Sequence, residues 1–304
     1  MAHRVLIVLV GLVGGVLRLL VFASVVLAES GSGGPCVVRE TASYRVTYGL
    51  FGQVAEASVS LVPEMTVLAG QSDGMPLLVQ AQGVGSGEVL GFGKTDKRIN
   101  SEFDARSLAA RHWRSVKSAK GKVITDAGEQ TEPGAVALLR KRAGENDRTE
   151  SFRRSTPVLD PLSFLLHLRI APPKQPTVHE VLDGRALWLA KVSAARPDVA
   201  SPKLLRVDGK LEPIDWGGGA DEKRSRYSFS LFLTRDRHHT PVRLVVPFGF
   251  GEVRADLVQL DRTEGSGEQL ASGGFDCREP RDRPFWRGLT EGWSSMWSAS
   301  LRRR

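Results

Sequence analysis

The sequence predicts a mainly β protein, a curved antiparallel sheet or open half-barrel with a short capping helix. Two features predict this fold class. Segments in which apolar and polar residues alternate with period two recur along the chain, most clearly over residues 227–257. The sequence also shows no alternation of strands with long helices, which argues against a doubly wound α/β fold.

The first 28 residues are typical of a signal peptide. An apolar run follows Arg18 and ends in Val26-Leu27-Ala28, with small residues where a signal peptidase reads, so we expect cleavage after Ala28. The alternative is an uncleaved inner-membrane anchor, because a bilayer span needs roughly 20 residues. Either way the rest of the chain is exported, to the periplasm or the outer envelope.

Composition shifts divide the chain into four expected parts. They are a signal peptide (1–28), a Gly/Ser-rich linker (29–36), an antiparallel β domain (37–262) and a C-terminal tail (263–304). The formal net charge of +8 favours contact with anionic lipid or polysaccharide, or else is simply solvated. Nucleic acid is not an expected partner, since an exported chain without a matching motif gives no reason for one.

Two cysteines, Cys36 and Cys277, flank the predicted β domain. Export permits disulfides, and two cysteines allow one pairing, so we expect a Cys36–Cys277 bond that ties the ends of the domain together. The alternative is a pair of free, buried thiols.

The β domain begins with a predicted strand pair, in which apolar and polar residues alternate over residues 44–48 and 53–61. Residues 77–84 are a further candidate strand. Residues 115–156 are more polar and more charged. We expect turns between short strands at the edge of the fold there, or partly mobile loops.

A short helix is predicted within residues 157–173. Asp160 is a good N-cap, because its carboxylate can accept hydrogen bonds from the free N–H groups of the first turn. Pro161 suits the first helical position, where no donor is needed, and Pro172 and Pro173 end the helix. We expect this helix to plug or cover the curved sheet.

Three patterns resemble catalytic motifs, and each lacks an essential residue. Ser163 and His167 share a helical face with no third partner. Glu88 stands where a phosphate-binding loop needs glycine, and Asp183 stands where a zinc-protease helix needs its second histidine. We therefore expect no catalytic residue, metal or cofactor from these motifs.

The C-terminal half predicts a strand over residues 185–192 and then a β-meander. Three alternating segments, 226–233, 241–246 and 252–260, are separated by tight turns.

Five segments in this order resemble a bacterial exported family, domain of unknown function 3108. They are YRVTYGLFGQVAEASVSL, EFDARSLAARHWRS, DPLSFLLHLR, LFLTRDRHHTPVRLVV and GEVRADLV. The resemblance covers about residues 40–260 and implies an exported, mostly antiparallel β protein, similar in outline to the half-barrels of periplasmic lipoprotein carriers. The family has no agreed activity, so it implies no site residues.

Three functions remain open at the level of sequence. The first is a non-enzymatic envelope protein that binds lipid, lipoprotein or an extended ligand in the groove of the curved sheet. The second is a hydrolase of envelope polymers that uses the scattered carboxylates Asp104, Asp160 and Asp236. The third is a structural scaffold without a ligand.

The tail predicts an amphipathic helix with a tryptophan-rich apolar stripe. The stripe consists of Trp286, Leu289, Trp293, Met296, Trp297 and Leu301. One hypothesis is peripheral contact with a membrane, because tryptophan favours the membrane interface and the terminal arginines suit anionic headgroups. The alternative is that the stripe packs back on the sheet.

Overall fold

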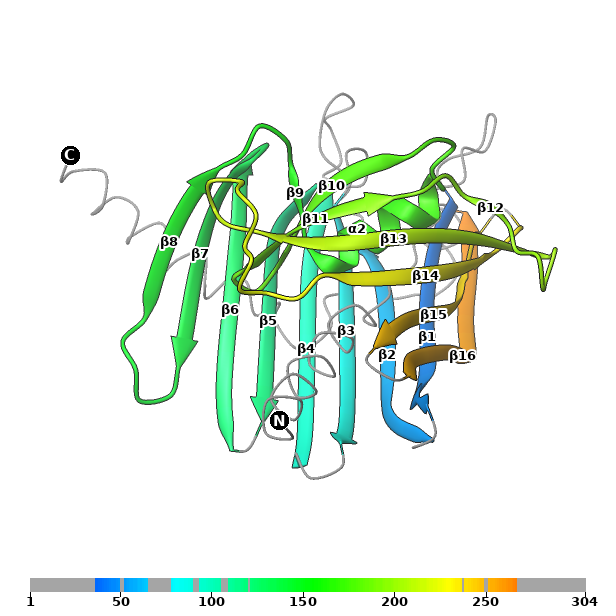
Figure 1. Ribbon diagram of the computed structural model, residues 1–304, viewed down its shortest axis with the longest axis horizontal. Helices are drawn as coiled ribbons and strands as arrows, with labels where there is room; N and C mark the ends of the chain where they lie inside the picture. Colours follow the sequence, from blue (N-terminus) through cyan, green and yellow to red (C-terminus); the bar gives the residue numbers. More distant parts are fainter. Residues whose placement is uncertain are drawn as a thin grey trace.

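The computed structural model describes residues 36–49, 52–64, 78–89, 93–104, 109–119, 121–236, 238–248 and 251–266. They form one curved sheet around a single described helix (Figure 1), which confirms the predicted fold class. In these ranges no helix has the length and apolar character to cross a membrane. The expected signal peptide, Cys277 and the tail stripe from Trp286 to Leu301 lie outside the described residues, and the predictions about them stay predictions.

The N-terminal limb of the sheet is an antiparallel meander. Its strands are β1 (Cys36–Tyr48), β2 (Gln53–Glu64), β3 (Leu78–Val89), β4 (Gly93–Asp104), β5 (Ala110–Ala119), β6 (Lys122–Glu132), β7 (Ala135–Arg142) and β8 (Arg148–Arg153). β8 is one free edge of the sheet. Residues 115–156 therefore form strands joined by tight turns next to the β8 edge, which confirms the expected turns at the edge of the fold. The strands between these turns are longer than expected.

The C-terminal limb continues the same sheet. Its strands are β9 (Val158–Leu159), β10 (Thr177–Asp183), β11 (Ala186–Val192), β12 (Arg196–Pro197), β13 (Leu204–Ile214), β14 (Tyr227–Thr234), β15 (Pro241–Phe248) and β16 (Gly251–Ser266). β14, β15 and β16 form the meander that the sequence predicts. Short β9 pairs in parallel with β10 and forms the other edge of the sheet.

The two limbs join where the first and last strands pair. β1 and β16 are antiparallel neighbours from the Cys36–Ser266 pair to the Tyr48–Val253 pair. From this seam the strand order runs outward to β8 on one side and to β9 on the other. Both edges of the sheet therefore come from the middle of the sequence, while the first and last described strands pair at its centre.

Helix α2 (Pro161–Ile170) lies between the limbs. In Figure 1, β10, β11, β13 and β14 cross the N-terminal limb at a steep angle, with α2 enclosed. Eight of its ten residues are buried, which is typical of a helix that is apolar on all sides and fills a core. Phe164 packs edge-on against Phe229 of β14, with 6.3 Å between ring centroids. The helix thus plugs the concave side of the sheet.

Candidate functional site

The polar residues at the start of α2 cap the helix. Asp160 accepts a hydrogen bond from the Leu162 N–H at 2.9 Å and one from the Ser101 hydroxyl of β4 at 2.7 Å. The Ser163 hydroxyl accepts from the Asp160 N–H at 2.9 Å, which completes a capping box. Burial raises the pKa of the Asp160 carboxyl, although these hydrogen bonds lower it. Both side chains are fully buried, so neither can act on a substrate.

His167 takes no part in this capping box. Its ring lies edge-on to His179 of β10, with 4.6 Å between centroids. Burial lowers the pKa of both imidazoles; for His179, with the nearby His167 as a second cause, the pKa falls to about 4. Asp160, Ser163 and His167 therefore do not form a catalytic set.

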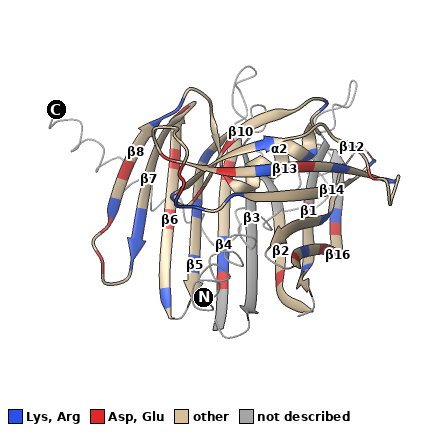
Figure 2. Cartoon of the chain, in the orientation of Figure 1, with Lys and Arg blue, Asp and Glu red and all other residues tan. Residues whose placement is uncertain are grey.

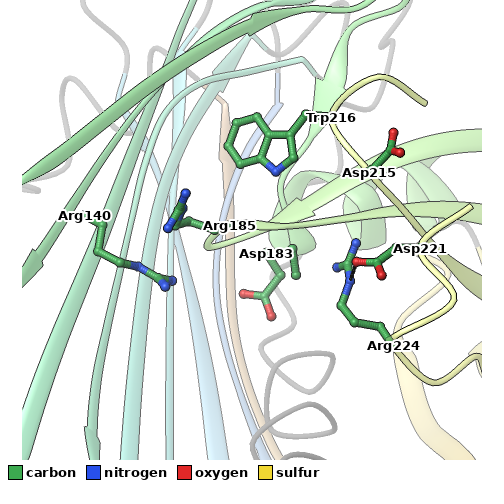
Figure 3. A pocket seen from close by; sticks show the side chains of 8 residues that line it. Arg140, Asp183, Arg185, Asp215, Trp216, Asp221 and Arg224 are labelled. Carbon is green, nitrogen blue, oxygen red and sulfur yellow. Dashed lines mark hydrogen bonds and ion pairs between the residues drawn. The ribbon is translucent and has the colours of Figure 1, made fainter. Parts of the chain in front are cut away.

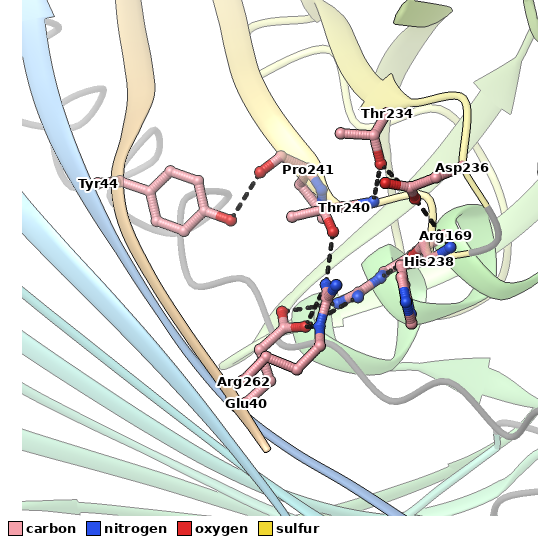
Figure 4. Close-up of polar contacts among 9 residues, drawn as sticks. All are labelled: Glu40, Tyr44, Arg169, Thr234, Asp236, His238, Thr240, Pro241 and Arg262. Atoms are coloured by element: carbon pink, nitrogen blue, oxygen red, sulfur yellow. Dashed lines mark hydrogen bonds and ion pairs between the residues drawn. The ribbon is translucent and has the colours of Figure 1, made fainter. Parts of the chain in front are cut away.

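A buried ion cluster fixes the other end of α2 (Figure 4). Arg169 donates two hydrogen bonds of 3.0 Å to the Glu40 carboxylate of β1, and its Nε donates to the His238 carbonyl at 2.6 Å. Arg262 of β16 donates to the same carboxylate at 2.8 Å and to the Thr240 hydroxyl at 2.7 Å. The helix is therefore tied to both strands of the seam.

The scattered carboxylates considered for hydrolysis do not gather. Asp160 is a buried cap, whereas Asp236 lies in the β14–β15 turn. There Asp236 accepts hydrogen bonds from the Thr234 hydroxyl at 2.8 Å and from the His238 N–H at 2.9 Å. The side chain of Asp104 lies outside the described residues.

Two cavities that share lining residues lie at the β10–β11 turn and the loop after β13. The first has a volume of about 340 Å³ (Figure 3), and it is lined by three arginines, three aspartates and a tryptophan: Arg140, Arg185, Arg224, Asp183, Asp215, Asp221 and Trp216. The second has a volume of about 430 Å³ and continues toward Leu189, Glu212 and Arg226. Asp221 and Arg224 line both cavities, so together the cavities form one groove.

The β10–β11 turn forms one wall of the groove because a glycine lets it lie directly on the other limb. Gly184 has φ +60°, and a Cβ there would stand 2.7 Å from the Asp126 carboxylate. Arg140 of β7 holds that carboxylate through two hydrogen bonds, of 2.5 and 2.8 Å. On either side of Gly184, Asp183 pairs with Lys97 of β4 at 2.8 Å, and Arg185 pairs with Glu150 of β8.

Arg224 stands at the junction of the two cavities. Its Nε donates to Asp221 at 2.6 Å, its Nη2 donates to the Leu187 and Ile214 carbonyls, and its guanidinium lies 5.1 Å from the Trp188 ring centroid. Its Nη1 is buried and has no hydrogen-bond partner. An unsatisfied buried donor is costly, so this atom is suited to an acceptor that enters the groove.

The strand register places several basic residues of β4 to β8 on one face of the sheet, and Figure 2 shows where lysine and arginine fall along these strands. The strand register places Lys97 opposite Lys117, and Arg140 opposite Arg148. The β10–β11 turn adds a further arginine over this surface. We call the set the cationic face: Lys97, Lys117, Arg140, Arg142, Arg148 and Arg185.

None of these groove residues was predicted as a site from the sequence. Asp183 and Gly184 were identified only as a turn, and the basic residues of β7 were assigned to loops. The groove is assembled from three separate stretches of the chain, at residue 140, residues 183–189 and residues 212–226, and their spacing carries no motif. Among the residues that the structure describes, His, Cys, Asp and Glu form no group of three or more suited to a metal ion.

Comparison with known proteins gives a family but no activity. The chain is similar to the crystal structure of a beta-barrel-like protein of domain of unknown function DUF1849 from Brucella abortus, with 14% identity and a TM-score of 0.44 over 74% of this chain and 98% of that one. It is also similar to LprF from Mycobacterium bovis, with 14% identity and a TM-score of 0.22 over 73% and 85%. No curated protein matches the chain. The family model described as protein of unknown function (DUF3108) matches residues 43–258, and the chain belongs to that family.

Proposed function

We propose that this is an exported envelope protein that binds, without catalysis, an extended ligand in the groove formed by its two adjoining cavities. The ligand classes are a lipid, a lipoprotein or another extended molecule. The observation that carries the proposal is the groove itself. Its cavities of about 340 and 430 Å³ share Arg224 and lie side by side along the sheet, an arrangement that suits an extended molecule.

The groove has the volume of a binding site and is more highly charged than most. Ligand pockets commonly have volumes of roughly 300–1,000 Å³ and combine apolar walls with a few placed polar groups. Here Trp216, Leu189 and Ile214 supply apolar surface, and the arginines and aspartates supply donors and acceptors. Trp216 is held in place by an edge-on contact with Phe152, with 4.6 Å between ring centroids.

The position of α2 determines where the ligand binds. Because Leu162, Phe164 and Leu166 of the helix are fully buried, the concave side beneath the helix is already filled. Exposing such side chains costs about 1.5–3 kcal/mol each. We therefore propose that the ligand enters the open groove and does not displace the helix.

Export to the cell envelope is part of the proposal, and the N-terminal segment supports it. The apolar run that ends in Val26-Leu27-Ala28 has the pattern of a signal peptide. Peripheral membrane contact through the tail remains a separate proposal, which deletion of residues 284–304 and vesicle binding would test.

Native mass spectrometry of protein purified gently from its own envelope tests the groove. We expect a bound molecule that is lost from Ala186→Trp, because Ala186 lines the first cavity, and from Ala220→Trp, because Ala220 lines the second. The matched control is Val199→Trp, at a position that is 98% exposed and away from both cavities.

The outcomes separate the candidate functions. Retention of the bound molecule by both groove variants, with unchanged melting temperatures, would contradict the proposal. Turnover of an envelope polymer by the purified protein would instead favour the hydrolase. A chain that never carries a ligand from its native envelope would favour the scaffold.

A further inference from the structure

We propose that the ligand of this groove carries an anionic group, a phosphate or a carboxylate, which binds on the cationic face. This inference rests on the proposed binding function and specifies the chemistry of its ligand. The cationic face lies along one wall of the first cavity, to which it contributes Arg140 and Arg185.

The sheet register concentrates positive charge on this face beyond what the fold needs. Lys97 stands directly opposite Lys117, and Arg140 directly opposite Arg148. Like charges in directly opposed cross-strand positions are destabilising. Asp183 and Asp126 offset part of this repulsion through their pairs with Lys97 and Arg140, and a bound anion would offset more of it.

The carboxylates on this face compensate only part of its charge. Asp215 and Asp221 also line the first cavity. Three carboxylates within the face, those of Asp126, Glu150 and Asp183, pair with Arg140, Arg185 and Lys97. A fourth, Glu145, contacts Arg142 and Arg148 from the rim, at 3.4 and 3.8 Å. The rim contacts join side chains that are 38–61% exposed, and such pairs contribute little.

The arginines show the effect of this excess. The pKa of Arg185 is lowered first by burial and next by the nearby charges of Arg140 and Arg148, with Asp126 acting in the opposite direction. An anion bound among these side chains would relieve their mutual repulsion. Guanidinium groups also suit the task, because their planar fork matches the oxygens of a phosphate or carboxylate.

Two guanidinium donors are left without acceptors around the groove. The Nε of Arg142 and the Nη1 of Arg224 are both buried and have no hydrogen-bond partner. Charge-assisted hydrogen bonds to an anionic oxygen are the strongest way to satisfy such donors. Excess charge and unsatisfied donors are independent observations, and both point to an anion.

The test measures binding of two anionic probes at low salt. Pyrophosphate, followed by calorimetry, represents a free phosphate. Vesicles of phosphatidylglycerol, compared with vesicles of phosphatidylcholine in co-sedimentation, represent a lipid headgroup. We expect at least one probe to bind, and Arg142→Gln combined with Arg185→Gln to weaken that binding by about tenfold or more.

The matched control is Arg196→Gln. Arg196 pairs with Asp208 on an exposed surface outside both cavities, so its loss removes the same charge without touching the cationic face. We expect the control to bind like the unchanged protein, and all binding to weaken as salt screens the charges. Thermal melts of both variants establish that they are folded.

The outcomes distinguish the two sources of the anion and separate this inference from the proposed function. Pyrophosphate binding without vesicle binding identifies a free or polymer-borne anion, and vesicle binding that the double variant loses identifies a lipid headgroup. Failure of both probes, or equal weakening by Arg196→Gln, overturns the anionic ligand. If a neutral molecule is nevertheless displaced by Ala186→Trp, the groove still binds a ligand and only this inference fails.

Discussion

Charged side chains are paired differently in two regions of the molecule, the closed end around α2 and the open end at the groove and the cationic face. Around α2, the buried charges of Asp160, Arg169 and Glu40 have short hydrogen bonds from within the protein. At the open end, Arg142 on the cationic face and Arg224 in the groove each keep a buried donor without a partner. The charges at the closed end are paired within the protein, whereas we propose that a ligand pairs with those at the open end. We therefore expect substitutions at the closed end to lower stability, and substitutions at the open end to weaken ligand binding.

The largest effect is expected at Glu40, at the closed end. Glu40→Ala leaves Arg169 buried without its carboxylate, and loss of one partner of a buried ion pair costs about 3–5 kcal/mol. Urea unfolding measures this cost. A loss below about 1 kcal/mol would contradict a stabilising role for the cluster.

A smaller effect is expected at the helix cap. Asp160→Ala should lower the free energy of unfolding by about 0.5–2 kcal/mol, and Asp160→Asn or Asp160→Ser by less, because these side chains also cap helices. Thermal melts of the three variants compare them. Equal large losses for Asn and Ala would show that Asp160 does not act as a cap.

Two histidines should give opposite pH dependences of stability. His179, beside α2, has a pKa lowered to about 4, so the unfolded chain binds its proton first and stability falls as pH drops from 6.5 toward 4. On the other face of the sheet, hydrogen bonds to Glu102 and Glu129 raise the pKa of His112 to about 9.

The contribution of His112 is therefore fully present below pH 6.5 and is lost as pH rises toward 9. Melting temperatures measured from pH 4 to 9 follow both effects. We expect His179→Gln to reduce the pH dependence of the melting temperature only between about pH 4 and 6.5, and His112→Gln to reduce it only between about pH 6.5 and 9. If either variant changes the pH dependence in the other range, the assignment of that range to its histidine is wrong.

The smallest effect on stability is expected on the cationic face. Arg148→Gln removes a charge directly opposite Arg140, so we expect the free energy of unfolding to stay within about 0.5 kcal/mol or to rise slightly. If Arg148→Gln lowered the free energy of unfolding as much as Asp160→Ala, the proposed difference between the closed and open ends would be wrong. Chemical denaturation of both variants under the same conditions decides this.

The closed end was largely predictable from sequence. Asp160 and Pro161 mark the helix start through local hydrogen-bond chemistry, and the strands after Tyr227 alternate because one of their faces is buried. The partners of these residues could not be predicted. Glu40 and Arg169 are 129 residues apart, and no local rule relates them.

The open end was missed because its chemistry disrupts the strand pattern. On β7, Arg140 and Arg142 occupy the same face as Val136 and Leu138. The alternation of apolar and polar residues is therefore lost at the end of β7, next to the groove. Charged residues on an inward face violate the rules of a packed core. Such violations are often found at functional sites, which agrees with the proposed binding site.

The seam between β1 and β16 has a consequence for how the chain is made. β16 is the only described strand that joins the two limbs along the strand order, and it is the last to leave the ribosome. Until it arrives, the chain can form only two separate meanders. Pairings between such distant segments close slowly, because long loops must be ordered first. We therefore expect completion of the sheet to be a late folding step.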